Sequence, residues 1–154
     1  MTKYKQYRQG FFTPNNALKY KGSSPVVYRS SLELCYMRWL DNNRNIVSWG
    51  SESVVIPYIK PTDGKLHRYF IDFNFTIKDK NKQLHKFLVE IKPAKQCKAP
   101  NTKNRKNKQN LLKEQITYAV NIAKWTASKQ WADHNGYKFV IVTEIDIKNI
   151  KNNK

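Results

Sequence analysis

The sequence predicts an α/β fold in which a mixed central β-sheet is flanked by helices. Two apolar, β-branched and aromatic segments, 66–78 and 84–92, lie five residues apart and predict a hairpin. Helical periodicity appears before them at 28–43 and after them at 110–131. A further apolar segment at 137–147 predicts a last strand. The order helix, three strands, helix, strand (αβββαβ) is typical of a sheet with helices on its faces.

The first predicted helix, 28–43, carries its own start signal. Ser30 and Glu33 have the spacing of a capping box, in which each side chain bonds to a backbone N–H at the helix start. Apolar residues then recur at helical intervals: Leu32, Cys35, Tyr36, Trp39 and Leu40. The pair Asn42-Asn43 ends the helix.

The predicted strands follow, separated by turn signals. In order, we expect an edge or bulged strand at 53–60 around Pro57, a turn at 61–65, a strand at 66–78, a tight loop at 79–83 and a strand at 84–92. The segment "HNGYK" ends the second helix before the strand at 137–147.

The remaining segments are basic and polar. Residues 1–27 predict an irregular N-terminal arm, and residues 93–108, which hold no acidic residue, predict a mobile basic loop. The end of the chain, 148–154, is expected to fray. At 154 residues, the simplest organisation is a single domain, 1–154.

The charge balance points to a polyanionic partner. The chain has 29 Lys and Arg against 11 Asp and Glu, a net charge of +18. Nucleic acid is the commonest such partner, and a membrane surface is disfavoured because no basic amphipathic segment stands out. Structural RNA binding remains an alternative on charge alone.

Cysteine and histidine usage excludes a zinc site. The two cysteines, Cys35 and Cys97, form no Cys-x-x-Cys pair, and the three histidines are widely spaced. We expect free thiols in a reducing compartment. No signal peptide or membrane span is recognisable, so we expect a soluble intracellular protein without membrane association.

Two acidic residues lie inside apolar strand segments, where charges are rare. Asp72 lies between Ile71 and Phe73, and Glu90 lies two residues before Lys92. A hairpin centred on Asn81 places Asp72 directly opposite Glu90, with Cβ atoms about 4.5–5.5 Å apart on one face. Side chains alternate along a strand, so Lys92 shares the face of Glu90.

Two carboxylates so close together require compensation. Either one of them has a raised pKa or a cation lies between them. Mg²⁺ prefers oxygen ligands and is commonly held by one or two carboxylates, and a lysine beside it could position a water or neutralise a phosphate. The arrangement therefore favours metal-assisted phosphodiester hydrolysis. The alternative is that both acids are ordinary strand charges with Lys92 as their salt-bridge partner.

The ordered blocks "YRSSLE…W…ES…IPY…DGKLHRYFIDF…FLVEIKP" resemble the PD-(D/E)XK nuclease superfamily. The resemblance implies a restriction-endonuclease-like core. The sequence is more closely similar to the head-completion nucleases of contractile-tailed phages, over roughly residues 10–95. Transposase-subunit endonucleases of the Tn-seven type share a looser version of the pattern.

The resemblance implies roles for individual residues. Asp72 matches the first aspartate of the motif, and Glu90 and Lys92 match its E-x-K. Asp72, Glu90 and the backbone carbonyl of Ile91 are then expected to hold Mg²⁺, with Mn²⁺ as a substitute, while Lys92 assists the attacking water. The proline of the motif is replaced by Ile71.

Two further positions have both a catalytic and a structural interpretation. Glu33 matches an acidic residue that many members carry on the first helix, but as a capping residue it would bend back to the helix start. Gln115 and Tyr118 are similar to a Q-x-x-x-Y element of some members, although the spacing is one residue short. Their alternative is a polar helix edge with a packed tyrosine.

Basic residues near the motif are the expected DNA contacts, because lysines without neighbouring acids attract phosphates irrespective of sequence. These residues are Arg68, Lys95, Lys98, Lys103, Arg105 and Lys106. The four tryptophans are expected in the core.

The sequence thus predicts a Mg²⁺-dependent DNA endonuclease. The resemblance implies a role in phage head completion or DNA packaging, in the host cytoplasm or associated with the virion. Capsid or portal proteins and a second copy of the chain are candidate partners. The alternatives are a transposition- or repair-type endonuclease of the same fold and a non-catalytic nucleic-acid-binding capsid protein.

Overall fold

The computed structural model describes residues 9–153. A four-stranded sheet forms its centre. In spatial order its strands are β3 (Ile46–Ser51), β6 (Phe73–Lys78), β7 (Leu84–Ile91) and β8 (Tyr137–Val142). The neighbours β3–β6 and β6–β7 are antiparallel and β7–β8 is parallel. The mixed α/β sheet predicted from the sequence is therefore confirmed.

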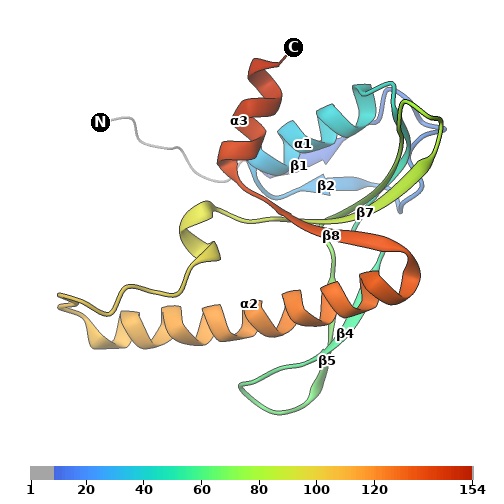
Figure 1. Ribbon diagram of the computed structural model, residues 1–154. Coiled ribbons are helices and arrows are strands. Elements are labelled where there is room, and N and C mark those ends of the chain that lie inside the picture. Colours follow the sequence, from blue (N-terminus) through green and yellow to red (C-terminus); the bar gives the residue numbers. More distant parts are fainter. Residues whose placement is uncertain (1–8, 154) are drawn as a thin grey trace.

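Helices cover both faces of the sheet (Figure 1). One face carries α1 (Ser31–Asn42), α3 (Glu144–Asn152) and the small antiparallel pair β1 (Gly10–Phe12) and β2 (Val26–Tyr28). The long helix α2 (Lys108–Asn135) lies on the other. The side chains of Met37, Leu40 and Trp49 are fully buried in the core on the α1 side.

Strands β4 (Val55–Ile59) and β5 (Leu66–Phe70) form a separate antiparallel ribbon. The ribbon passes α2 and projects beyond it in Figure 1. Its buried residues Ile56, Tyr58 and Tyr69 belong to a second apolar cluster with α2 and Leu88 of β7. Only Ile71 and Asp72 separate the end of β5 from the start of β6, so the ribbon is joined directly to the central sheet.

The single strand predicted at 66–78 is wrong, because the chain changes partner within it. Up to Phe70 it pairs with β4, and from Phe73 it pairs with β3 and β7. At the bend, the Ile71 N–H donates to the Val54 carbonyl (3.1 Å), and the Asp72 side chain accepts from the Ile91 N–H (2.8 Å). These bonds satisfy backbone groups that a continuous ladder would otherwise pair.

The C-terminal predictions are also corrected. The strand expected at 137–147 ends at Val142. The tail expected to fray at 148–154 is helical through Asn152, and residue 154 lies outside the described part. The Asp146 carboxylate accepts from the backbone N–H of Thr143 (2.8 Å), which caps α3. Buried Ile147 then packs α3 against α1.

Other segments differ in detail. The arm predicted at 1–27 includes the short strands β1 and β2, and residues 1–8 of it lie outside the described part. Strand β3 was not predicted from the sequence. Helix α1 has the expected N-cap, Ser30. Helix α2 exceeds 110–131 at both ends, from its cap Asn107 to Gly136 at a φ of 74°. The basic loop 93–108 contains a short 3₁₀ turn, η1 (Ala94–Cys97). Within residues 9–153, none of the helices could cross a membrane.

Candidate active site

The hairpin register brings Asp72 and Glu90 to one place. Strand β6 pairs with β7 from Phe73 opposite Val89 to Lys78 opposite Leu84, and the same register continued by one residue places Asp72 opposite Glu90. This is the register predicted for a hairpin centred on Asn81, which is confirmed. Phe73 and Val89 point into the core on the α1 side. Because side chains alternate along β7, Glu90 points with Leu88 to the opposite face, toward α2 and the ribbon. Asp72 lies in the bend before β6, and its carboxyl is close enough to Glu90 for the charge of Glu90 to raise its pKa.

Asp72 is held at the end of β6 by backbone contacts. Its Oδ2 accepts the Ile91 N–H at 2.8 Å, and its own carbonyl accepts the N–H of Glu52 at 3.1 Å. Two effects raise the pKa of Asp72 well above the usual range of an aspartate. The larger is burial, and the second is the negative charge of Glu90. The site therefore resists two negative charges unless a cation offsets them.

Glu90 is buried, with only 6% of its surface exposed. The Tyr69 hydroxyl donates a hydrogen bond to Oε2 of Glu90, and the Lys92 ammonium lies 3.4 Å from Oε1. The carboxylate is therefore held from both sides, by the ribbon and by its own strand. Lys92 remains partly exposed (21% of its side chain), so it can meet a substrate.

Lys124 of α2 also reaches this site, although the sequence reasoning missed it. Its Nζ lies 5.1 Å from the ring centroid of Tyr69 and 5.8 Å from that of Tyr58. Burial lowers the pKa of Lys124, and the charge of Glu90 opposes that change. The available signal was a lysine inside the inner stripe of α2, between Val120 and Ala127, where an apolar residue is expected.

Glu33 behaves as a capping residue. Its N–H donates to Ser30 Oγ (3.1 Å), and its carboxylate turns back to accept the Arg29 N–H (2.8 Å). Burial raises the pKa of Glu33, and its charge is also one of those that raise the pKa of Asp72. Arg29 in turn forms an ion pair with Glu52, whose N–H bonds Asp72. Glu33 is thus near the carboxylate pair but directed to its own helix start.

The donor set fits a hard divalent cation. Within residues 9–153 no three His, Cys, Asp or Glu side chains are grouped closely enough to hold an ion, so a site here relies on two carboxylates and the backbone. The Lys92 N–H points to Val142 of β8 (3.0 Å), so by alternation the backbone of Ile91 points the other way, toward Asp72. Two carboxylates and a carbonyl, with waters, suit Mg²⁺ or Mn²⁺.

Gln115 is not brought to this site. It is exposed on α2 and precedes Lys124 by nine residues, or about two and a half helical turns. The two side chains therefore point to opposite sides of the helix. Its predicted catalytic placement is therefore not supported by the geometry. Tyr118, its predicted partner, lies about 60° around the helix from Gln115 and lines a groove.

The predicted DNA contacts fall into two groups. Arg68 lies exposed on β5, 5.6 Å from the Phe70 ring, at a distance from the basic loop in sequence. In the loop, Lys103 and Lys106 are exposed. The other three line a groove between η1, the loop and α2, with a volume of about 600 Å³; they are Lys95, Lys98 and Arg105.

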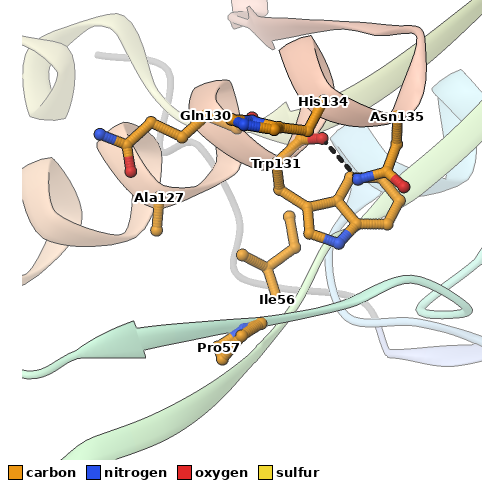
Figure 2. A pocket seen from close by; sticks show the side chains of 7 residues that line it. All are labelled: Ile56, Pro57, Ala127, Gln130, Trp131, His134 and Asn135. Carbon is orange, nitrogen blue, oxygen red and sulfur yellow. Dashed lines mark hydrogen bonds between the residues drawn. The ribbon is translucent and has the colours of Figure 1, made fainter.

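A smaller hollow of about 350 Å³ lies between the ribbon and the end of α2 (Figure 2). Ile56 and Pro57 form one wall, and Trp131 faces them from α2. Asn135 bonds the Trp131 carbonyl (2.8 Å), and His134 bonds a backbone carbonyl of the same helix (2.8 Å). Among residues 9–153 no carboxylate lines this hollow, so it offers none of the chemistry found at Glu90.

Comparison with known proteins agrees with this architecture. Residues 43–144 match the family described as TnsA-like endonuclease N terminal, a stretch that contains both carboxylates and Lys92. The chain belongs to the TnsA-like endonuclease family. Its fold is restriction-endonuclease-like, with the mixed sheet between α1 and α2. This TnsA-like chain is also 39% identical over 139 residues to the head completion nuclease of Enterobacteria phage T4, covering 88% of this chain and 90% of that protein.

Proposed function

We propose that this protein is a Mg²⁺-dependent DNA endonuclease that acts in phage head completion. One observation carries the proposal: Asp72 and Glu90 face each other across the end of a hairpin, with Lys92 3.4 Å from the Glu90 carboxylate. Buried acids of this kind are rare without a partner, and the raised pKa of Asp72 indicates that a cation would relieve their repulsion. The +18 charge favours a polyanionic substrate.

Each residue has a role that follows from its position. Asp72, Glu90 and the Ile91 carbonyl would hold Mg²⁺, which when bound supplies Lewis-acid activation of the phosphate and acidification of a water. Tyr69 fixes one oxygen of Glu90 and so leaves the other directed at Lys92. Lys92 orients or deprotonates the attacking water, or neutralises charge on the phosphate. Hydrolysis then needs no covalent intermediate with the protein.

The biological setting is inferred from the relative. The head completion nuclease of phage T4 matches nearly the whole chain, including both carboxylates and Lys92 within the aligned extent. We therefore place this nuclease in the host cytoplasm or on the virion, acting on packaged DNA, with capsid or portal proteins as partners. A homodimer would supply a second site for the second strand of a duplex.

The function is tested by incubating supercoiled plasmid with the full-length protein in Mg²⁺, in Mn²⁺ and in EDTA. Glu90→Ala and Lys92→Ala are assayed at the same concentration, with circular dichroism as a check on folding. We expect cleavage in both metals, none in EDTA, and a loss of about 100-fold or more in each variant. Cleavage that persists in both variants would contradict the site assignment. Retarded but uncut DNA with the wild type would support a non-catalytic binding protein instead.

A second candidate is a transposition-type endonuclease, favoured by the TnsA-like match over 43–144. Cleavage of arbitrary plasmid by the isolated chain, without a preferred sequence, would favour the head-completion role.

A further inference from the structure

A basic groove runs along one face of α2 toward the carboxylates. It has a volume of about 600 Å³, and its walls are α2 on one side and residues 95–105 on the other. Three of its cationic side chains, Lys95, Lys98 and Lys113, have no acidic partner within hydrogen-bond distance among the described residues. Arg105 pairs with Glu114 (2.7 Å) at the same groove. The surplus positive charge suits a phosphodiester backbone.

The α2 wall of the groove carries the aromatic ring of Tyr118 and the side-chain amide of Asn121. Tyr118 is partly exposed there, and no other aromatic ring stacks on it among the described residues. Asn121 is more than nine-tenths buried, lines the groove, and forms no side-chain hydrogen bond with residues 9–153. Its amide atoms open to the groove and are not sealed from solvent, so a ligand in the groove can supply the hydrogen bonds that water otherwise makes.

The groove leads to the cutting site. Tyr118, Asn121 and Lys124 follow one another at three-residue intervals, each about 4.5 Å further along the axis and turned by about 60°, so the row passes around α2 from the groove to the side that meets Tyr69. Lys124 stands over Tyr69, which bonds Glu90. On the opposite wall, η1 begins two residues after Lys92. A strand lying in the groove would thus end beside both Glu90 and Lys92.

From these observations we propose that the α2 groove binds an unpaired DNA strand and delivers its phosphate to Glu90 and Lys92. Tyr118 stacks on a base, Asn121 hydrogen-bonds a base edge, and the lysines hold the phosphates. The enzyme then prefers DNA with a single-stranded tail or end over a blunt duplex. This inference rests on the proposed nuclease function and names the substrate of that same site.

An unpaired strand fits the groove better than a duplex does. A duplex presents its phosphates on the outside of a wide cylinder and keeps its base faces stacked, so it meets exposed lysines and cannot reach a ring in a recess. An unpaired strand exposes base faces and edges. Aromatic rings set in a basic groove are the common way in which proteins bind such strands without sequence preference.

The test measures binding by fluorescence anisotropy, with Ca²⁺ in place of Mg²⁺ to prevent cleavage. The probes are one labelled duplex with blunt ends and the same duplex with a single-stranded tail. We expect the wild type to bind the tailed duplex about tenfold more tightly than the blunt duplex. This is the gain in affinity that the stacking of one base on an aromatic ring provides. Tyr118→Ala and Asn121→Ala should lose this preference while keeping their affinity for the blunt duplex. Tyr118→Phe, which retains the ring, should keep it.

The matched control is Phe11→Ala, which removes an aromatic ring that is 73% exposed on β1, outside the groove. It should keep the preference for the tailed duplex. Equal binding of both duplexes by the wild type, or an unchanged preference in both Tyr118→Ala and Asn121→Ala, would overturn the inference. Because binding is measured without cleavage, a protein that discriminates but never cuts would contradict the proposed function alone. One that cuts but does not discriminate would contradict this inference alone.

Discussion

Tyr69 donates its hydroxyl hydrogen to Oε2 of Glu90, across the boundary between the β4–β5 ribbon and the central sheet. The bond joins the two sheets at the point where the chain passes from one to the other. It also fixes which oxygen of Glu90 faces Lys92, at 3.4 Å. The bend at Asp72 therefore has a consequence for chemistry, because it brings a phenol from one sheet to a carboxylate of the other.

Removing that hydroxyl should impair catalysis more than folding. In Tyr69→Phe the buried ring is kept and only the bond to Glu90 is lost. We expect the cleavage rate to fall by about tenfold, since a hydrogen bond to a charged group contributes roughly 1.5–3 kcal/mol. Initial rates in Mg²⁺ and the melting temperature check this. An unchanged rate would mean that Tyr69 does not position Glu90.

Lys124 and Gln115 lie on opposite faces of α2 and form a matched pair. Lys124→Met keeps the apolar stem but removes the charge above Tyr69, so we expect cleavage to fall by about tenfold or more. Gln115→Ala should leave the rate unchanged, because that side chain is directed away from the site. Both are measured on one plasmid substrate. A larger loss in Gln115→Ala than in Lys124→Met would contradict the placement of the site.

The raised pKa of Asp72 predicts how stability depends on pH. In the unfolded chain this carboxyl ionises near its ordinary pKa, whereas in the folded protein it holds its proton to higher pH. The folded state therefore binds more protons between the two pKa values, and stability falls as pH rises through that window. Asp72→Asn should raise the melting temperature by a few degrees at neutral pH without metal.

The gain in Asp72→Asn should shrink as the pH is lowered below the ordinary pKa of aspartate, where the wild-type carboxyl is protonated in both states. Thermal melts in EDTA across this range measure the difference. A stabilising effect that is constant with pH, or a destabilised variant at neutral pH, would contradict the assigned direction of the shift.

The salt dependence of DNA binding reports how many phosphates the protein neutralises. Removing one lysine that binds a phosphate should lower the slope of log affinity against log salt by about 1. Lys95→Ala and Lys98→Ala remove groove charges and should each have this effect. Lys148→Ala removes an exposed charge on α3, outside the groove, and should leave the slope unchanged. Equal slopes in all three variants would show that the groove does not meet phosphates.

The cap of α3 should contribute to stability. Asp146→Ala removes the acceptor of the Thr143 N–H at the start of the helix, which is expected to cost about 1 kcal/mol of unfolding free energy. Urea denaturation measures it, and cleavage at permissive temperature should remain. An unchanged midpoint would indicate that packing of Ile147 alone holds the helix.

The parts of the fold that local signals determine were predictable. The register of the β6–β7 hairpin follows from a short loop, and the start of α1 follows from Ser30 and Glu33. Both depend on residues that are close together in the chain. The pairing of Asp72 with Glu90 could therefore be predicted from the sequence alone.

Features that depend on distant partners were not predictable. No glycine or proline interrupts the sequence 66–78, and only the tertiary arrangement makes it exchange β4 for β3 and β7. The segment "EIDI" fits a strand as well as a helix, and packing on α1 selects the helix. Lys124 comes near Glu90 because α2 crosses below the sheet, and the local pattern marks only an unexpected lysine in an apolar stripe, not its neighbours.

The most direct test of the central claim is a calorimetric titration with Mn²⁺. It compares the wild type with Asp72→Asn and Glu90→Gln. The claim is that these two carboxylates hold the metal. The wild type is predicted to bind Mn²⁺, and each variant, which keeps its shape but loses one charge, to bind at least about tenfold more weakly. Wild-type affinity in both variants would contradict the claim, because the ion would then be held elsewhere.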